Sequence, residues 1–211
     1  MTRRATHARG HDAGHFGSPA AVRRLEDEER ALAGVVDEAV AALAALADGR
    51  PVRRLLDLGC GPGGALAALG DAFPGAALVA ADASPAMLAR VAARAAEAGI
   101  GSRVYTRRVD LDGDLDALGR CDLVWAAMSL HHARDPGATL VAARRLLEPS
   151  GLLCLLERAP AEGHPGGRQG DHGEVGPDLV AAAGLDVVTD RTLGVGDAAT
   201  ARRLIIGVAA G

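Results

Sequence analysis

The sequence of 211 residues has few aromatic residues, no lysine and no long hydrophobic run. Its longest aliphatic run, residues 152–156, is far shorter than the roughly 20 residues that a transmembrane helix requires, so no membrane span is predicted. All 23 basic residues are arginines and the formal net charge is -4, so a dedicated nucleic-acid-binding protein is not expected. No apolar stretch follows the first arginines as it would in a signal peptide, and we therefore expect a cytoplasmic protein.

Cysteine and aromatic residues are both scarce. Cys60, Cys121 and Cys154 lie far apart without a CxxC pair or metal-ligand spacing, and each is embedded in apolar or glycine-rich sequence. We therefore expect three small buried side chains and no metal site. Because aromatic residues make up 2% of the chain, stacking cages for bases or flat substrates are expected to be sparse.

Residues 1–17 are polar, rich in histidine and glycine, and lack hydrophobic periodicity, so they are expected to form a disordered tail. Three of the histidines recur every four residues, at His7, His11 and His15. On a helix this spacing could bind a metal ion, but the glycines between them disfavour a helix. A solvated tail is therefore the favoured interpretation.

A long amphipathic helix is predicted over residues 19–47. Ser18 and Pro19 are a typical helix start, because the serine hydroxyl caps free amides and proline fits the first helical position. Apolar residues then keep a broadly helical spacing as far as Leu46. We expect residues 18–50 to form a helical lid or cap segment.

The rest of the chain, residues 51–211, alternates between strands and helices. Five strands are expected at residues 55–58, 77–81, 103–109, 122–127 and 152–157, with helices at 65–69, 85–99 and 136–147 between them. A short helix at 178–183 and two closing strands at 185–189 and 204–208 follow. Ser84-Pro85 and Asp135-Pro136 are expected to cap the helices at 85–99 and 136–147 as Ser18-Pro19 caps the first helix. Residues 149–151 are expected to turn the chain into the fifth strand. This alternation predicts an α/β fold with a doubly wound, mostly parallel seven-stranded sheet and a C-terminal antiparallel strand pair.

A glycine-rich segment follows the first strand. Gly59, Gly61 and Gly64 fit the pattern GxGxxG, and glycines here let a ligand approach backbone amides at a helix N-terminus. Asp82 ends the second strand, 18 residues after Gly64, where a carboxylate can accept hydrogen bonds from ribose hydroxyls. Both a nicotinamide enzyme and an adenosine-binding enzyme would use such an acid, so these residues alone leave both classes open.

Two further carboxylates distinguish these classes. Asp57 lies just before the glycines, where it would repel a pyrophosphate but could hold an ammonium group. Asp110 ends the third strand and is placed to accept from an adenine amino group. Three carboxylates at successive strand ends favour a ligand with ammonium, sulfonium, ribose and adenine groups over one with phosphates, and S-adenosylmethionine has those parts.

Several segments in order resemble the motifs of the class I S-adenosylmethionine-dependent methyltransferases. The similar stretches are residues 55–63, 79–88, 108–110 and 121–132. The resemblance is strong over about residues 52–157 and is greatest to the small-molecule branch, which includes ubiquinone and menaquinone methyltransferases and natural-product tailoring enzymes. Before the fifth strand the family usually has Pro-Gly-Gly, whereas this chain has Ser150 in place of the first glycine.

The resemblance implies S-adenosylmethionine as the cofactor and a role for each matching residue. Asp57 would assist the methionyl ammonium, Asp82 would bind ribose, and Asp110 with Leu111 would recognise adenine. The other expected cofactor-binding residues are Gly59, Cys60, Gly61, Gly63, Ala83, Met87, Ala127 and Met128. Methyl transfer of this kind depends mainly on proximity and orientation, so a general base is optional.

His131 and His132 follow the fourth strand at the edge where ligands bind, and they are the candidate catalytic bases. The alternative is that one packs under the cofactor while the other caps the next turn. Glu157 is expected either to face the pocket or to be a solvated strand end. Trp125 is expected in the core, and Asp122 at the opposite edge from the cofactor.

The acceptor is expected to be a small molecule, and a homodimer is a further expectation. Relatives usually roof the active site with a helical insertion after strand five, whereas residues 158–176 here are a short glycine-rich loop. Its substrate-facing candidates are His164, Arg168, Gln169 and His172. The helix at 19–47, a partner subunit, or no roof at all remain alternatives.

Two other functions stay open. A non-catalytic S-adenosylmethionine-binding regulator would explain the short roof. An NAD(P)-dependent oxidoreductase would fit GxGxxG, but a chain without lysine lacks the Tyr-x-x-x-Lys pair of short-chain dehydrogenases.

Overall fold

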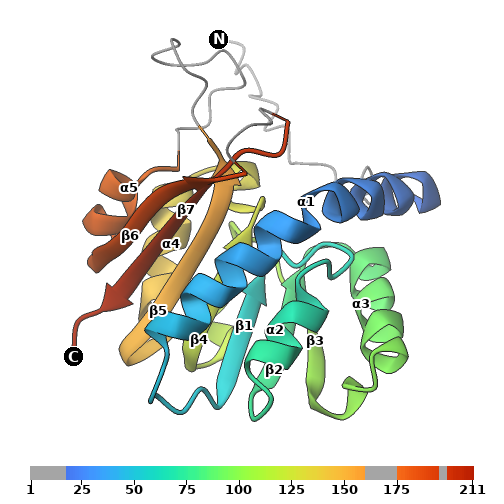
Figure 1. Cartoon of the computed structure of the whole chain (residues 1–211), viewed down its shortest axis with the longest axis horizontal. Helices are drawn as coiled ribbons and strands as arrows, with labels where there is room; N and C mark the ends of the chain where they lie inside the picture. The colour runs from blue at the N-terminus through green and yellow to red at the C-terminus, as the bar shows by residue number, and fades with distance from the viewer. Residues whose placement is uncertain (1–17, 160–174, 195–198) are drawn as a thin grey trace, which may run out of the picture.

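The computed structural model describes residues 18–159, 175–194 and 199–211, which fold around one seven-stranded sheet (Figure 1). The strands are β1 (Arg54–Leu58), β2 (Ala77–Asp82), β3 (Val104–Arg108), β4 (Cys121–Ala127), β5 (Leu147–Arg158), β6 (Leu185–Leu193) and β7 (Arg202–Ala209). Their order in the sheet is β3-β2-β1-β4-β5-β7-β6; the first five are parallel, and β7 is antiparallel to both β5 and β6. The predicted fold class is therefore confirmed.

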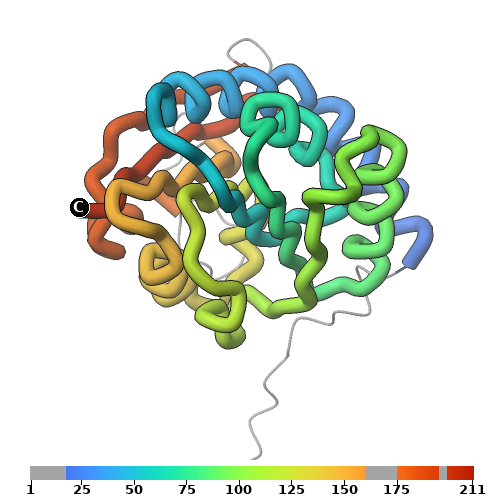
Figure 2. The backbone as a smooth tube through the Cα atoms, turned by 90° about the horizontal axis from the view of Figure 1, so that it is seen from below, coloured from blue at the N-terminus to red at the C-terminus, as the bar shows by residue number. Residues whose placement is uncertain are grey.

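Helices cover both faces of the sheet (Figure 2). They are α1 (Pro19–Leu46), α2 (Leu66–Ala72), α3 (Pro85–Glu97), α4 (Pro136–Leu146) and α5 (Pro177–Ala182). Alternate strand residues serve the two faces, because Leu55 packs in the cluster with α1, α2 and α3 whereas Leu56 packs with α4 and α5. Burial on both faces explains why the parallel strands are apolar runs without alternation.

The long helix α1 forms as the sequence predicts. The Ser18 hydroxyl accepts a hydrogen bond from the Ala21 amide at 3.1 Å and so caps the helix. Farther along, Leu32, Val35, Ala39, Val40 and Leu43 are buried at helical spacing, and the last four share a core cluster with the sheet. No described helix is both long enough and apolar enough to cross a membrane.

Two local predictions are wrong. Ser84 precedes α3 as Ser18 precedes α1, but its hydroxyl caps nothing; it is buried without a hydrogen-bond partner among the described residues. The fifth strand begins at Leu147 instead of residue 152, and the predicted turn lies inside it. Ser150 has φ +61° there, and the register against β4 shifts between Cys121 and Leu123, so residues 149–151 form an irregularity within a continuous strand.

The expected core positions are confirmed. Trp125 is 1% exposed, and the three cysteines are buried and free. Burial raises the pKa of each thiol, to about 12 for Cys121, so these side chains are neutral packing groups at ordinary pH.

Asp122 holds the start of the central strands together. As predicted, it lies at the edge of the sheet opposite the glycine-rich segment, where its Oδ2 accepts hydrogen bonds from the amides of Arg53 and Arg54 at 2.8 and 2.9 Å. One carboxylate thus fixes the entry of β1 beside β4.

Replacing Asp122 with alanine should therefore lower the free energy of unfolding by about 1–3 kcal/mol, because two backbone donors lose a charged acceptor. Urea denaturation followed by circular dichroism measures the change. Asp186→Ala, which removes an exposed aspartate of β6, is the matched control and should change stability by less than about 0.5 kcal/mol. Equal effects of the two variants would contradict the role given to Asp122.

Candidate active site

A cavity of about 920 Å³ opens at the carboxyl edge of the parallel strands. The strand order reverses between β1 and β4, and ligands of open α/β sheets bind in the crevice at such a reversal. Its wall combines the glycine-rich loop, the ends of β2 to β5, α1 and residues 199–202. The volume lies at the upper end of the range of ligand pockets.

The glycine-rich loop is shaped by two different requirements. Gly59 has φ +74°, and a Cβ atom on it would lie 2.4 Å from the Ser129 Cβ, so glycine here lets the loops after β1 and β4 pack together. Gly61 has φ +51°, and a Cβ atom on it would have a Glu29 oxygen as its nearest neighbour, at 3.8 Å. The backbone of Gly61 therefore faces open space in the cavity. A ligand could approach this backbone closely.

Gly63 differs from the other predicted glycines, because it does not line the large cavity. It has φ +90°, and a Cβ atom would lie 3.1 Å from the Val91 side chain. The left-handed backbone and the close packing against α3 therefore explain why this position is glycine.

A cluster of acids occupies one end of the cavity. Asp57 is 6% exposed, and burial together with the charges of Glu29 and Asp82 raises its pKa to about 8. Burial also raises the pKa of Asp82, although the amides of Ser84 and Gly61 donate to its two oxygens at 2.8 and 3.0 Å. Carboxyls this close resist ionising together, and a positively charged ligand would favour their ionised form.

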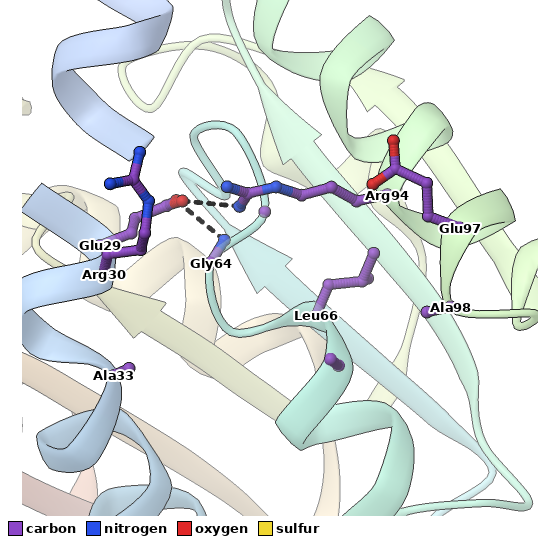
Figure 3. Close-up of a pocket in the computed structure, with 10 residues that line it drawn as sticks. Glu29, Arg30, Ala33, Gly64, Leu66, Arg94, Glu97 and Ala98 are labelled. Carbon is purple, nitrogen blue, oxygen red and sulfur yellow. Dashed lines mark hydrogen bonds and ion pairs between the residues drawn. The ribbon is translucent and has the colours of Figure 1, made fainter. Parts of the chain in front are cut away.

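Glu29 on α1 is a member of this cluster that the sequence analysis missed. Its Oε1 accepts from the Gly64 amide at 2.8 Å and its Oε2 pairs with Arg94 of α3 at 2.6 Å (Figure 3). Glu26, one turn earlier, pairs with Arg90 at 2.6 Å. Glu29, Gly64 and Arg94 line a smaller cavity of about 420 Å³ between α1, α2 and α3. The spacings of three and four residues place each pair on one helix face, but nothing local in the sequence indicates which helix it meets.

A histidine and a glutamate occupy the end of the cavity beyond β4 and β5. Glu157 is 4% exposed and accepts from the amides of Ser129 and Leu130 at 3.2 and 2.9 Å. Its Oε2 lies 2.8 Å from Nδ1 of His131. Glu157 is therefore a buried acceptor behind the cavity wall, and the expectation of a solvated strand end is wrong.

The loop after β4 is held in one shape by these bonds. Met128 has φ +52°, a left-handed conformation that is uncommon outside glycine, and its amide donates to the Leu156 carbonyl at 2.7 Å. His131 and His132 both line the cavity, and their ring centroids are 4.1 Å apart. The contact with Glu157 fixes the orientation of the His131 ring.

The other predicted cofactor-binding residues also lie around the cavity. Its wall includes Cys60, Ala83, Met87, Asp110, Leu111, Ala127 and Met128. The predicted tail with its three histidines and the candidates His164, Arg168, Gln169 and His172 lie outside the described residues.

Comparisons with known proteins agree with this geometry. Residues 56–153 match the family described as Methyltransferase domain. The malonyl-[acyl-carrier protein] O-methyltransferase of Dechloromonas aromatica (strain RCB) is 36% identical over 126 residues, which are 56% of this chain and 43% of that protein. The nocamycin O-methyltransferase of Saccharothrix syringae is 39% identical over 118 residues, 54% of this chain and 41% of that protein. The chain thus spans less than half the length of either relative.

A solved structure shows the same fold over most of the chain. A SAM-dependent methyltransferase from Aquifex aeolicus superposes with a TM-score of 0.70 at 16% identity, covering 90% of this chain and 98% of that one.

The raised pKa of Asp57 predicts a pH-dependent stability. Between the unfolded pKa of about 4 and the folded value of about 8, the native state holds a proton that the unfolded chain has lost, so stability falls as the pH rises. Asp57→Asn removes the ionisable group and therefore this loss of stability at high pH. Thermal unfolding of the ligand-free variant should show a melting temperature at least about 3 °C above wild type at pH 9, with a smaller difference at pH 5. Asp186→Asn should give no pH-dependent difference; a constant offset for Asp57→Asn would contradict the raised pKa.

Proposed function

We infer that the chain, which carries a methyltransferase-family domain over residues 56–153, transfers a methyl group from S-adenosylmethionine to a small-molecule nucleophile. The observation that carries this proposal is the cavity at the strand-order reversal, with clustered acids at one end and an oriented histidine at the other. Relatives named as O-methyltransferases support an oxygen acceptor, and nitrogen or carbon acceptors remain part of the proposal.

The acidic end of the cavity fits the cofactor. The buried Ser84 hydroxyl and the Asp82 carboxylate lie on its wall, and both are suited to hydrogen bonds with ribose hydroxyls. Asp57 lies where it can stabilise an ammonium group, and the exposed Asp110 with Leu111 lies at the end of β3 for the adenine. When bound, S-adenosylmethionine supplies a methyl group activated by a positively charged sulfur.

The same contacts disfavour a dinucleotide. A pyrophosphate needs free backbone amides at the glycine-rich loop, but the Gly64 amide already donates to Glu29. Asp57 would add further repulsion. The oxidoreductase alternative therefore has no support from the site beyond the sequence pattern.

His131 is suited to act as a general base. Its Nδ1 faces Glu157, so the other ring nitrogen, Nε2, remains to take a proton from the acceptor while Glu157 stabilises the resulting charge. This arrangement supports an enzyme over a protein that only binds the cofactor. The remaining work of the site is to hold the acceptor in line and to exclude water.

The wider setting is also part of the proposal. Because α1 lines the cavity, it serves as the lid, and its contacts through Glu26 and Glu29 hold it in place. A homodimer and a cytoplasmic location remain predictions from the sequence.

Binding of the cofactor is the first test. Calorimetric titration should show micromolar affinity for S-adenosylmethionine and S-adenosylhomocysteine but not for NADH. Asp82→Ala should abolish this binding without unfolding the domain, because Asp82 both contacts the ligand and holds the glycine loop through Gly61. Asp186→Ala should bind as wild type. Binding of NADH alone, or unchanged affinity of Asp82→Ala, would refute the assignment.

The role of His131 is tested by the pH dependence of turnover. With the best acceptor from a panel of phenols, hydroxy acids and amines, His131→Gln should lower kcat at least about 100-fold and remove the acidic limb of the pH profile. Glu157→Gln should also lower kcat, because the imidazolium loses its carboxylate, while the KM for S-adenosylmethionine stays near wild type. His132→Gln is the matched comparison. An unaltered kcat and pH profile in His131→Gln would leave orientation alone as the mechanism.

A further inference from the structure

Two arginines face each other across neighbouring strands at the end of the cavity away from the acids. Arg158 ends β5, Arg202 begins β7, and the antiparallel register pairs them directly. Both line the cavity. Like charges placed directly opposite each other in a sheet destabilise it, so this pair calls for an explanation.

Neither arginine has a carboxylate partner within ion-pair distance in the described parts of the chain. The next position in the register shows the contrast, because Arg203 forms a two-point pair with Asp190 at 2.7 and 2.9 Å. The Arg202 Nη1 instead donates to the carbonyls of Ala199 and Ala201 at 3.0 and 2.8 Å, which fixes the guanidinium.

Arg202 also carries an unused donor. Its Nε is buried and has no hydrogen-bond partner among the described residues. Buried donors of this kind are rare unless a ligand or water completes them. Burial and the charge of Arg158 lower the pKa of Arg202 by more than the charges of Glu157 and Glu28 raise it, so this cation is incompletely balanced.

The other charged groups at this end do not cancel the pair. Glu28 of α1 lines the cavity, but it lies 3.8 Å from Arg24, one turn earlier on the same helix. Glu157 is engaged by His131 and by two backbone amides. Among the residues that the structure describes, Arg158 and Arg202 therefore remain as a surplus of positive charge.

The arginines line the same cavity as the histidine of the site. Arg158 directly follows Glu157, which holds His131, and the Leu156 carbonyl binds the first residue of the His131 loop. The cavity is therefore acidic where the cationic cofactor is proposed to bind and basic where the acceptor would enter.

We propose that Arg158 and Arg202 bind an oxyanion group, a carboxylate or a phosphate, of the methyl acceptor and present its nucleophile to His131. The planar guanidinium forks match such groups through paired hydrogen bonds. This inference rests on the proposed function and adds a substrate class to it: small anionic acceptors. An acceptor with such a group would also supply the counter-charge that the strand pair lacks.

The experiment separates a failure of the proposed function from a failure of this inference. Binding of S-adenosylhomocysteine is measured first, and its failure would remove the proposed function together with this inference. The saturated protein is then titrated by NMR with benzoate, phenyl phosphate and benzamide, which share a ring and differ in the charged group. We expect an anion to bind at least about tenfold more tightly than the neutral amide, and the stronger of the two anions identifies the group.

Two variants test the residues. Arg158→Gln and Arg202→Gln should each lower the affinity for the anion at least about tenfold. The affinity for S-adenosylhomocysteine should stay at the wild-type value, which shows that the domain is folded. Because Arg158 is the exposed member, its variant remains informative if Arg202→Gln fails to fold. Arg107→Gln, which removes an exposed arginine of β3, is the matched control. Equal binding of benzamide, no binding of either anion, or undiminished anion binding in Arg158→Gln would overturn the proposal.

Discussion

The parallel direction of β1 to β5 is the constraint on which the site depends. It delivers the carboxyl ends of five strands to one edge, and the reversal of order between β1 and β4 separates the helices that follow them. Asp57, Asp82 and the loop after β4 therefore meet around one cavity although they are distant in sequence. The antiparallel β7 then brings a strand start to that edge, and this adds Arg202 to the wall.

Two carboxylates stabilise the opposite ends of this cavity by binding backbone amides. Glu29 fixes the glycine-rich loop through Gly64, and Glu157 fixes the loop after β4 through Ser129 and Leu130. Each also binds a side chain: Glu29 binds Arg94 of α3, and Glu157 binds His131 of the loop that it fixes. Loops held in this way keep their shape without a ligand, which reduces the entropy lost on binding.

Much of the fold follows from local sequence, and the site follows only in part. Apolar runs bounded by glycine and Ser-Pro or Asp-Pro starts located every strand and α-helix of the described chain to within a few residues, apart from the early start of β5. The three short 3-10 helices among the described residues were not predicted. The hydroxyl of Ser84 shows the limit, since the same dipeptide that caps α1 leaves it without a partner before α3. Glu29, Glu157 and the pairing of Arg158 with Arg202 depend on register and helix packing, which no local pattern encodes.

The proposed acceptor end of the cavity uses residues outside the segment that matches the methyltransferase family. That segment, residues 56–153, contains the glycine loop, Asp57, Asp82, Asp110 and His131, whereas Arg158 and Arg202 lie outside it. Helix α1 also lies outside it, but its Glu29 holds the glycine loop through Gly64, so α1 contributes to both ends. Under the proposed function, a lineage could exchange one acceptor for another by altering the last residue of β5 and the start of β7, and the sheet edge proposed to bind the cofactor would be inherited unchanged.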